Sequence, residues 1–361
     1  MFLSMYRYLG LLIITFFLSH CSHEVNRKDR NRKPQPAQDA VSSSGGQFQD
    51  QQSAQQQQSD DPVSQRVGSQ QQQRPQLKFW SDPSSAAARD AARMQPSNGP
   101  DARRIRYIAE QGGARWYGDW SGNITRSVAA QMQSATQQNA AAVMVAYNIP
   151  GRDCGSYSAG GAPNAFAYRA WINDFAKALG STTAIIILEP DALAHDNCLT
   201  DERYDLIRYA ITTLKARPNT LVYIDAGHSA WIESGKMAER LLRASVELGD
   251  GFALNVSNYQ HSKNLIDYGK AIRSRGVSKN FVIDTSRNGN GPTPTNEWCN
   301  PAGRALGQRP AFPPDAPTIE GLDGYLWVKV PGESDGPCNG GPGAGGWWRE
   351  KALELARNAG I

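Results

Sequence analysis

The segment 184–194, AIIILEPDALA, places two carboxylates directly after a run of apolar, mostly β-branched residues. Such a run is typical of a strand buried on both faces, and Glu189 and Asp191 would then stand at its exit. Burial and neighbouring carboxylates both raise the pKa of a carboxyl group, because they disfavour its charged form. Asp191, which follows the rigid Pro190, is therefore a candidate general acid; the structural alternative is that it caps the next helix.

Polar sequences follow six apolar runs in the same way, and most of them contain Asp. The runs are 141–149, 184–189, 221–225, 252–256, 281–284 and 325–330, and the sequences at their exits are NIPGRDCGSYSAGG, EPDALA, DAGHSAW, NVSNYQ, DTSRNGNG and VPGESDG. Asp and Asn are common turn and N-cap residues, which would explain one or two of these exits. In a β/α barrel all strand exits meet at one face, so we expect the polar residues to share a site.

The residue types at these exits indicate acid–base chemistry on a neutral polyol. Several carboxylates occur together with Trp and Tyr, and no phosphate-binding or metal-binding motif accompanies them. Hydrolysis of a glycosidic bond needs one carboxylic acid to protonate the leaving oxygen. A second carboxylate activates water in an inverting reaction or attacks the sugar carbon in a retaining one. The sequence therefore favours such a site, with no cofactor and no metal.

Segments with helical periodicity lie between the apolar runs and would position the site. They are 164–179, 201–216 and 234–248, and Thr200 and Ser234 are candidate N-caps for the last two. Alternating strands and helices indicate a parallel sheet. Six or seven such units in residues 77–361 predict a β/α barrel, with a doubly wound open sheet as the alternative. A dinucleotide-binding fold would need a glycine fingerprint after the first strand, and none is there.

The first 76 residues read as two segments that precede the folded domain. Residues 1–21 contain Arg7 and the apolar run LGLLIITFFLS, which is shorter than the ~20 residues of a membrane span and fits a signal peptide. The sequence LSHC resembles a lipoprotein signal, with Cys21 as the lipidated residue, although His20 departs from the small residue expected there. Residues 22–76 are rich in Gln and polar residues and predict a disordered linker. We expect export, with a lipid anchor at Cys21 as the alternative.

Charge and cysteine content limit the partners further. The chain has a formal net charge of +4 and no polycationic segment. Nucleic acids and anionic membrane surfaces are therefore poor candidates for binding partners. Apart from Cys21 the chain has four cysteines, which in an exported protein read as two disulfides with three possible pairings. No CxxC spacing occurs, which argues against a zinc site. A monomer is the default expectation.

The motifs, taken in order, carry a family resemblance. YNIPGRDC, LEPDALA, YIDAGHSAW, NVSNY, DTSRNGNG, EWCNPAGRALG and LWVKVPGESDG closely resemble glycoside hydrolase family 6, the inverting cellulases, from about residue 78 to the C-terminus. The resemblance implies an α/β fold: a distorted seven-stranded parallel β/α (TIM-like) barrel with the active site at the C-terminal ends of the strands. It also implies hydrolysis of β-1,4-glucan.

The resemblance implies roles for individual residues on one side of the site. Asp191 takes the general-acid position, and Asp153 takes that of a second aspartate, which raises the pKa of the acid and helps to relay protons. Tyr147 matches the tyrosine that lies under the distorted sugar ring. Asp225 and His228 match positions that support sugar hydroxyls and the charge balance of the site.

On the other side, Asp335 takes the position proposed as catalytic base, in a family that may instead use a chain of waters. Lys329 and Glu333 match sugar-contacting positions. The family often places a water-holding serine six residues after the aspartate of RDC. Here that position is Ala159, so the adjacent Ser158 is the candidate for positioning the water.

The resemblance also implies sugar-stacking and disulfide positions. The aromatic candidates are Trp116, Trp231 and Trp298, with Asn258 and Asn255 as weaker polar candidates, whereas Trp171 reads as core. The implied disulfides are Cys154–Cys198 and Cys299–Cys338. His195 and His261 carry no argument for a partner, and solvated or locally hydrogen-bonded roles are the default for both.

The loop lengths bear on where a glucan would be cut. Cellobiohydrolases of this family roof the cleft with a loop inserted after the GESDG position, whereas here only Pro337 separates Gly336 from Cys338. The loop after RDC is short as well. An open groove admits the middle of a chain, so we predict a secreted endo-β-1,4-glucanase. The alternatives are a cellobiohydrolase-type enzyme, a catalytically silent glucan-binding barrel, and a hydrolase of other polyols or a metal-dependent barrel esterase.

Overall fold

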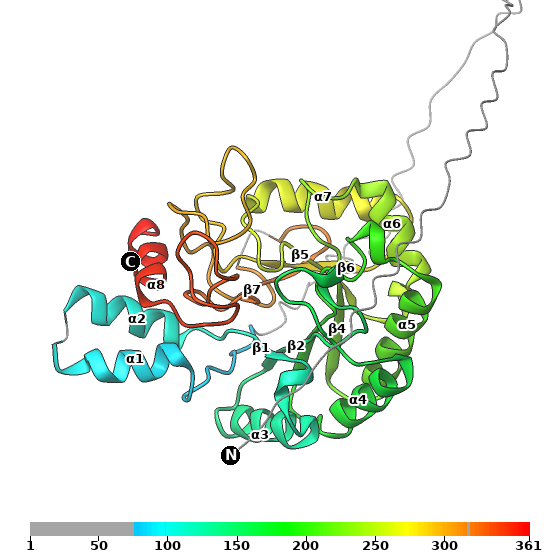
Figure 1. Cartoon of the computed structure of the whole chain (residues 1–361), viewed down its shortest axis with the longest axis horizontal. Coiled ribbons are helices and arrows are strands. Elements are labelled where there is room, and N and C mark those ends of the chain that lie inside the picture. The colour runs from blue at the N-terminus through cyan, green and yellow to red at the C-terminus, as the bar shows by residue number, and fades with distance from the viewer. Residues whose placement is uncertain (1–75, 98, 316–317) are drawn as a thin grey trace, which may run out of the picture. The chain divides into compact units, whose positions relative to one another are not determined.

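A computed structural model describes residues 76–97, 99–315 and 318–361 (Figure 1). The predicted signal peptide and all of the predicted linker except Gln76 lie outside these residues. Within them, no helix is long and apolar enough to cross a membrane.

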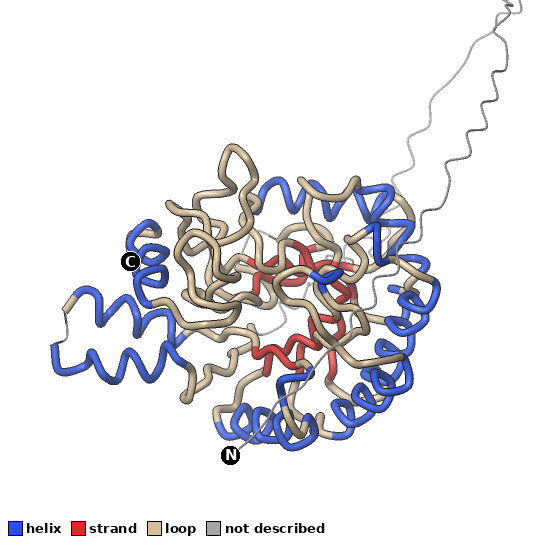
Figure 2. The backbone as a smooth tube through the Cα atoms, viewed as in Figure 1, coloured by secondary structure: helices blue, strands red, loops and turns tan. Residues whose placement is uncertain are grey.

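Seven parallel strands form one sheet in the part of the chain that the structure describes, and each strand pairs with its neighbour in sequence. They are β1 (Arg115–Tyr117), β2 (Ala142–Ala146), β3 (Ala184–Leu188), β4 (Thr220–Asp225), β5 (Gly251–Leu254), β6 (Asn280–Asp284) and β7 (Leu322–Leu326). The sheet curls (Figure 2), and its two edges meet where the Ala114 amide donates to the Trp327 carbonyl oxygen at 2.9 Å. This sequential order confirms the predicted distorted seven-stranded β/α barrel and excludes the doubly wound alternative, in which the strand order reverses.

Eight α-helices lie within the described ranges. They are α1 (Ala86–Met94), α2 (Pro100–Glu110), α3 (Ile124–Gln137), α4 (Ala165–Lys177), α5 (Asp201–Lys215), α6 (Ser234–Arg243), α7 (Ser262–Ser274) and α8 (Arg349–Asn358). Short 3₁₀ turns occupy Gln95–Ser97, Asp119–Ser121, Asp153–Gly155, Asp196–Cys198 and Val246–Leu248. Helices α3 to α7 form an arc outside the strands, while α1, α2 and α8 pack together at one side (Figure 1).

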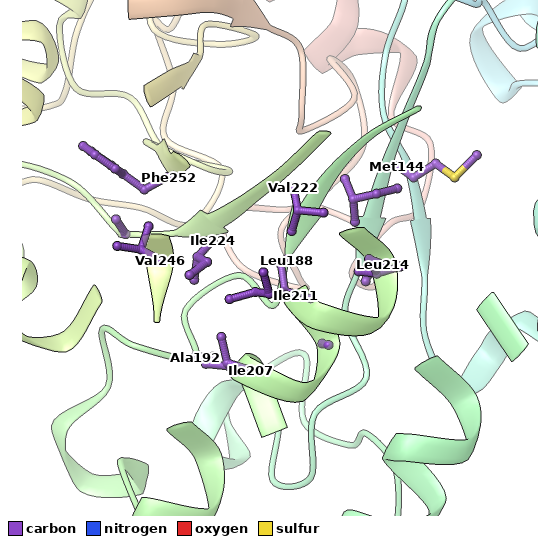
Figure 3. Close-up of a cluster of buried hydrophobic side chains, with 14 of the residues drawn as sticks. Met144, Leu188, Ala192, Ile207, Ile211, Leu214, Val222, Ile224, Val246 and Phe252 are labelled. Atoms are coloured by element: carbon purple, nitrogen blue, oxygen red, sulfur yellow. The ribbon is translucent and has the colours of Figure 1, made fainter. Parts of the chain in front are cut away.

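Residues of the central strands alternate between two apolar layers, because successive side chains of a strand point to opposite faces. In β3, Ile185 and Ile187 pack inside the barrel with Tyr223 of the next strand. Their neighbours Ile186 and Leu188 instead face the outer layer, which the helices complete. Figure 3 shows this outer layer, with Leu188, Val222 and Ile224 against Ile207, Ile211 and Leu214 of α5. Burial on both faces explains why these strands read as continuous apolar runs.

Helix starts follow from capping side chains. Thr200 caps α5 as predicted, since its hydroxyl accepts from the Arg203 amide at 3.2 Å. The expected Ser234 cap is wrong by one residue: the Glu233 carboxylate accepts from the Lys236 amide at 2.9 Å, and Ser234 is the first helical residue. Helix α6 also ends at Arg243, short of the predicted 248, because Ser245 adopts a left-handed conformation with φ 63°.

The last strand differs from the prediction for an electrostatic reason. The apolar run 325–330 predicts a strand there, whereas β7 ends at Leu326. Beyond it, the amides of Val328 and Lys329 donate to the carboxylate of Asp284 at 3.2 and 3.0 Å. The backbone after β7 is thus bound by a buried side chain of β6 and bends into the loop that carries Asp335.

Candidate active site

A cleft of about 1050 Å³ crosses the C-terminal ends of the strands. It brings together Trp116 of β1 and the predicted site residues from the loops after the six other strands. Asp225 and the weaker candidate Asn255 do not line it. Asn255 is fully buried and its side chain donates to the carbonyl oxygens of Asn258 and Asp284. The residues that line the cleft are Trp116, Tyr147, Asp153, Ser158, Asp191, His228, Trp231, Asn258, Trp298, Lys329, Glu333 and Asp335. Polar strand exits therefore do converge on one site.

Asp191 combines access to the cleft with a desolvated carboxyl group. The residue is partly exposed, and φ is +68°, so the chain turns sharply just after Pro190 and presents the side chain to the cleft. Burial, followed by the charge of Asp153, raises the pKa of Asp191 to about 6. The Tyr147 hydroxyl lies 3.4 Å from Asp191 Oδ2 and can donate to it. The carboxyl can therefore retain a proton in mildly acidic solution and still reach a ligand.

Asp225 supports Asp191 from beneath the cleft surface. It is 1% exposed, and its Oδ2 accepts from the backbone amides of Asp191 at 2.9 Å and Gly227 at 3.2 Å. Burial and then the charge of Asp191 raise the pKa of Asp225 to about 8. The resemblance implied support of sugar hydroxyls and of the charge balance of the site at this position. In the structure, the contacts of Asp225 fix the backbone of Asp191.

Glu189 is a structural carboxylate, although it stands at the same strand exit. It is fully buried, and its oxygens accept from the amides of Asn148 and Ile149 and from the hydroxyl of Tyr168, all at 2.9–3.1 Å. Burial raises the pKa of Glu189 to about 7. These bonds join the exit of β3 to the exit of β2, so Glu189 orders the backbone that carries Tyr147.

Asp153 lies in a loop that Arg152 holds in place. The buried Arg152 guanidinium donates to the Ser158 carbonyl oxygen at 2.7 Å and to Asp119 Oδ1 at 2.9 Å. In turn the Ser158 amide donates to Asp153 Oδ2 at 2.7 Å. The other oxygen, Asp153 Oδ1, lies 3.6 Å from His195 Nε2. Ser158 thus contacts Asp153 through its backbone, and its hydroxyl remains a candidate for positioning water.

Asp335 is a buried carboxylate surrounded by cationic and hydrogen-bonding groups. Its Oδ2 accepts from Arg287 Nη1 at 2.9 Å, the Tyr259 hydroxyl at 3.1 Å and the Asn300 amide at 3.0 Å, and Lys329 Nζ lies 3.5 Å from Oδ1. Burial alone would raise the pKa of Asp335, but the charges of Arg287 and Lys329 outweigh it and lower the pKa below its usual value. At pH values at which Asp191 is still protonated, Asp335 is therefore ionised.

Lys329 and Glu333 occupy the loop between β7 and Asp335. Lys329 Nζ donates to the Ser334 carbonyl oxygen at 3.0 Å, and burial lowers the pKa of this lysine. Burial raises the pKa of Glu333, which faces the cleft. Both predicted sugar-contacting residues are thus placed where a ligand could meet them.

Aromatic side chains form the walls of the cleft. Trp231 and Trp298 are 37% and 44% exposed, respectively, which is unusual for Trp and leaves their faces accessible. Trp116 is held edge-on against Tyr147, with ring centroids 5.4 Å apart. Trp171, in contrast, packs against the core beside Phe175, as the sequence indicated.

Both disulfides follow the pairing that the resemblance implied. Cys154 is bonded to Cys198, with the Cα atoms 5.9 Å apart, and Cys299 to Cys338, with the Cα atoms 6.1 Å apart. The first ties the Asp153 loop to the segment after Asp191. The second ties the Trp298 segment to the Asp335 loop. Among the described residues, no group of three or more His, Cys, Asp or Glu side chains could hold a metal ion.

Several residues of the site escaped the sequence reasoning. Arg287 and Tyr259 lie in the polar exits DTSRNGNG and NVSNYQ, and their place after predicted strands was an unused signal. His195 was expected to have only a default role, yet it lines the cleft. It follows Asp191 by four residues, a spacing that returns to the same side of a helical turn.

Comparisons with known proteins show the family to which the chain belongs. Residues 74–359 match the family described as Glycosyl hydrolases family 6. The chain is 44% identical over 289 residues to Endoglucanase A of Cellulomonas fimi, covering 79% of this chain and 62% of that protein. It is 41% identical over 277 residues to Endoglucanase 1 of Streptomyces halstedii, covering 74% of this chain and 84% of that protein. The chain thus spans less than two thirds of the length of the Cellulomonas relative.

A solved structure shares the fold. It is the endoglucanase Cel6 from Mycobacterium tuberculosis, in complex with methyl-cellobiosyl-4-deoxy-4-thio-β-D-cellobioside. The TM-score is 0.73 at 43% sequence identity, and the match covers 79% of this chain and 98% of that chain. The family match over most of the chain, together with these relatives, shows that the chain belongs to glycosyl hydrolases family 6.

Proposed function

We propose that this protein is an endo-β-1,4-glucanase that hydrolyses internal bonds of cellulose or a related glucan with inversion. The observation that carries the proposal is the contrast between two carboxyl groups in one cleft. Asp191 has a raised pKa, whereas Asp335 has a lowered one. An inverting reaction needs a protonated donor and an ionised acceptor at the same pH.

In the proposed reaction, Asp191 donates its proton to the glycosidic oxygen as the bond to the anomeric carbon breaks. Water attacks that carbon from the opposite face, and its proton leaves toward the carboxylates of the site. Asp335 is the candidate acceptor, either directly or through intervening water, and Asp153 is the candidate relay next to the acid. Tyr147, beside Asp191, would lie under the distorted sugar ring.

The cleft walls support a glucan as the substrate. A pyranose ring offers CH groups to an aromatic plane, and its hydroxyls can bond around the rim of the ring. We assign this stacking to Trp116, Trp231 and Trp298. The polar contacts then fall to His228, Asn258, Lys329 and Glu333. The pKa of His228 is lowered to about 4 by burial, so its imidazole would be neutral and able to both donate and accept.

Cleavage within the chain is favoured by the relatives and by loop length. Relatives at 39–44% identity carry endoglucanase names, whereas one named a probable cellobiohydrolase, from Aspergillus fumigatus, is 26% identical. The single residue between Gly336 and Cys338 leaves no room for a long roofing loop. We also infer export, with or without a lipid at Cys21, from the N-terminal sequence alone.

Viscometry with carboxymethylcellulose tests the proposal. An endoglucanase lowers viscosity much faster than it releases reducing ends, whereas a chain-end enzyme does the reverse. Activity should fall at least ~100-fold in Asp191→Ala, the usual size of general acid catalysis. Binding without hydrolysis in the parent would indicate a silent glucan-binding barrel, and loss of activity with a chelator would indicate a metal-dependent hydrolase. NMR of the first-formed anomer distinguishes inversion from retention.

A further inference from the structure

His195 contacts Asp153 on one side and Trp231 on the other. Its Nε2 is 3.6 Å from Asp153 Oδ1, an ion-pair distance that is longer than a good hydrogen bond. On its other side the ring meets Trp231 edge-on, with centroids 4.9 Å apart. The side chain is 31% exposed and lines the cleft, so it can exchange protons with solvent.

The charged groups around His195 favour its cationic form. The contact with Asp153 raises the pKa of His195, outweighing burial, and the charge of Asp191 acts in the same direction. Arg203 of α5 opposes them. The neighbouring Asp196 carboxylate is already paired with Lys236 and Arg240 of α6, and the buried His228 beyond Trp231 is neutral near pH 6.

We propose that His195 is a positioning residue that pairs as an imidazolium with Asp153 and offsets its negative charge beside Asp191. This inference rests on the proposed function, because the effect of His195 on activity would act through Asp191 as the general acid. The remaining contact of Asp153 is the Ser158 amide, which fixes the carboxylate without adding a full charge. Of these two described partners of the Asp153 carboxylate, His195 is the one able to switch its charge between pH 5 and 8.

The pairing of His195 with Asp153 changes the pKa of Asp191 in a predictable direction. A charged Asp153 raises the pKa of Asp191, and a cationic His195 lowers it. Replacing His195 with a neutral side chain therefore leaves Asp153 uncompensated, and Asp191 should keep its proton to a higher pH. Because the general acid must be protonated, the basic limb of the pH–activity profile should move upward. We expect a shift of roughly 0.5–1 pH unit, below the 1–3 of a close buried pair, because the site is partly solvated.

The experiment compares pH profiles of kcat/KM for the parent, His195→Gln and His261→Gln. Glutamine keeps a hydrogen-bond donor near Asp153 but cannot titrate. His261 is an exposed histidine outside the cleft and serves as the matched control, whose profile should overlay that of the parent. An upward shift of the basic limb in His195→Gln alone supports the pairing. A profile of His195→Gln that overlays the parent, or that only drops in height, overturns it.

A second measurement does not depend on activity or on the folding of His195→Gln. NMR titration of the histidine side chains should show a raised pKa for the His195 imidazole in the parent. In Asp153→Asn the pKa of that imidazole should fall, because its counter-ion is gone. If no histidine signal moves, the pairing is refuted. A parent that fails to hydrolyse carboxymethylcellulose at any pH would contradict the proposed function, while this titration would still decide whether His195 and Asp153 interact.

Discussion

Replacing Asp191 with Asn should remove catalysis that depends on proton donation and leave the rest of the site in place. Asn has nearly the same shape as Asp, and the backbone amide of residue 191 can still donate to Asp225. The side-chain amide can no longer protonate a leaving oxygen. With an unactivated glucan, whose leaving group is a sugar alkoxide, the reaction therefore loses its acid catalyst.

General acid catalysis sets the size of the loss, and the pKa of Asp191 sets its pH dependence. General acid catalysis contributes roughly 10²–10⁴-fold, or about 3–5.5 kcal/mol of the barrier. The pKa of Asp191 near 6 predicts that kcat/KM of the parent falls about tenfold per pH unit above that value. At pH 8 only about 1% of Asp191 would be protonated. Asp191→Asn should therefore lack this basic limb as well as most of its activity.

The assay uses two substrates whose leaving groups differ in their need for a proton. One is carboxymethylcellulose, and the other is an aryl cello-oligoside with a dinitrophenolate leaving group, which departs without protonation. Asp191→Asn should lose at least ~100-fold on the first and under ~10-fold on the second. Asp196→Asn, an aspartate of the same segment that does not line the cleft, serves as control. Equal losses on both substrates would refute the assignment of Asp191 as acid.

Three further predictions concern the rest of the cleft. Arg287→Met removes a cation 2.9 Å from the buried Asp335 and should lower the free energy of unfolding by about 3–5 kcal/mol in urea melts; a loss below 1 kcal/mol would contradict the importance of the pair. Tyr157→Ala removes a ring 5.6 Å from Trp298 that joins the loops after β2 and β6, and it should raise the ratio of viscosity loss to reducing ends, while Tyr157→Phe should not. His228 has a folded pKa of about 4 against 6.5 unfolded, so acidification protonates the unfolded chain first and stability falls by roughly 3 kcal/mol between those pH values. His228→Gln should show a shallower slope in this range, and an unchanged slope would refute a neutral buried imidazole.

Sequence periodicity predicted the interior of the barrel and failed at its edges for a physical reason. Strands such as β3 are covered on both faces, so their residues are uniformly apolar and easy to identify. The first strand is only Arg115–Tyr117, too short to form an apolar run. At the other edge, the run 325–330 predicts a strand, but the backbone amides of Val328 and Lys329 donate to the carboxylate of Asp284. No local pattern reveals a distant carboxylate that competes for backbone donors.

The site was partly predictable for the same reason. The raised pKa of Asp191 could be predicted from the strand before it, because burial at a strand exit is a local property. The roles proposed for Asp153 and Asp335 came from the resemblance. The pairs His195–Asp153 and Arg287–Asp335 were not predicted, since each joins segments more than 40 residues apart. Such contacts depend on how the strand-exit loops pack, which spacing alone does not encode.

The two sides of the cleft show how one residue type can have a raised pKa in one place and a lowered pKa in another. Asp191 and Asp335 are both desolvated, which by itself would raise the pKa of either. The difference lies in the counter-charge: Asp335 has Arg287 and Lys329 within 3.5 Å, whereas Asp191 has the like charge of Asp153 nearby. Between the two pKa values the cleft holds one protonated and one ionised carboxyl group, as the proposed donor and acceptor require. A bell-shaped pH profile should result, in which the pKa of Asp335, lowered by its neighbouring cations, sets the acidic limb and the raised pKa of Asp191 sets the basic one.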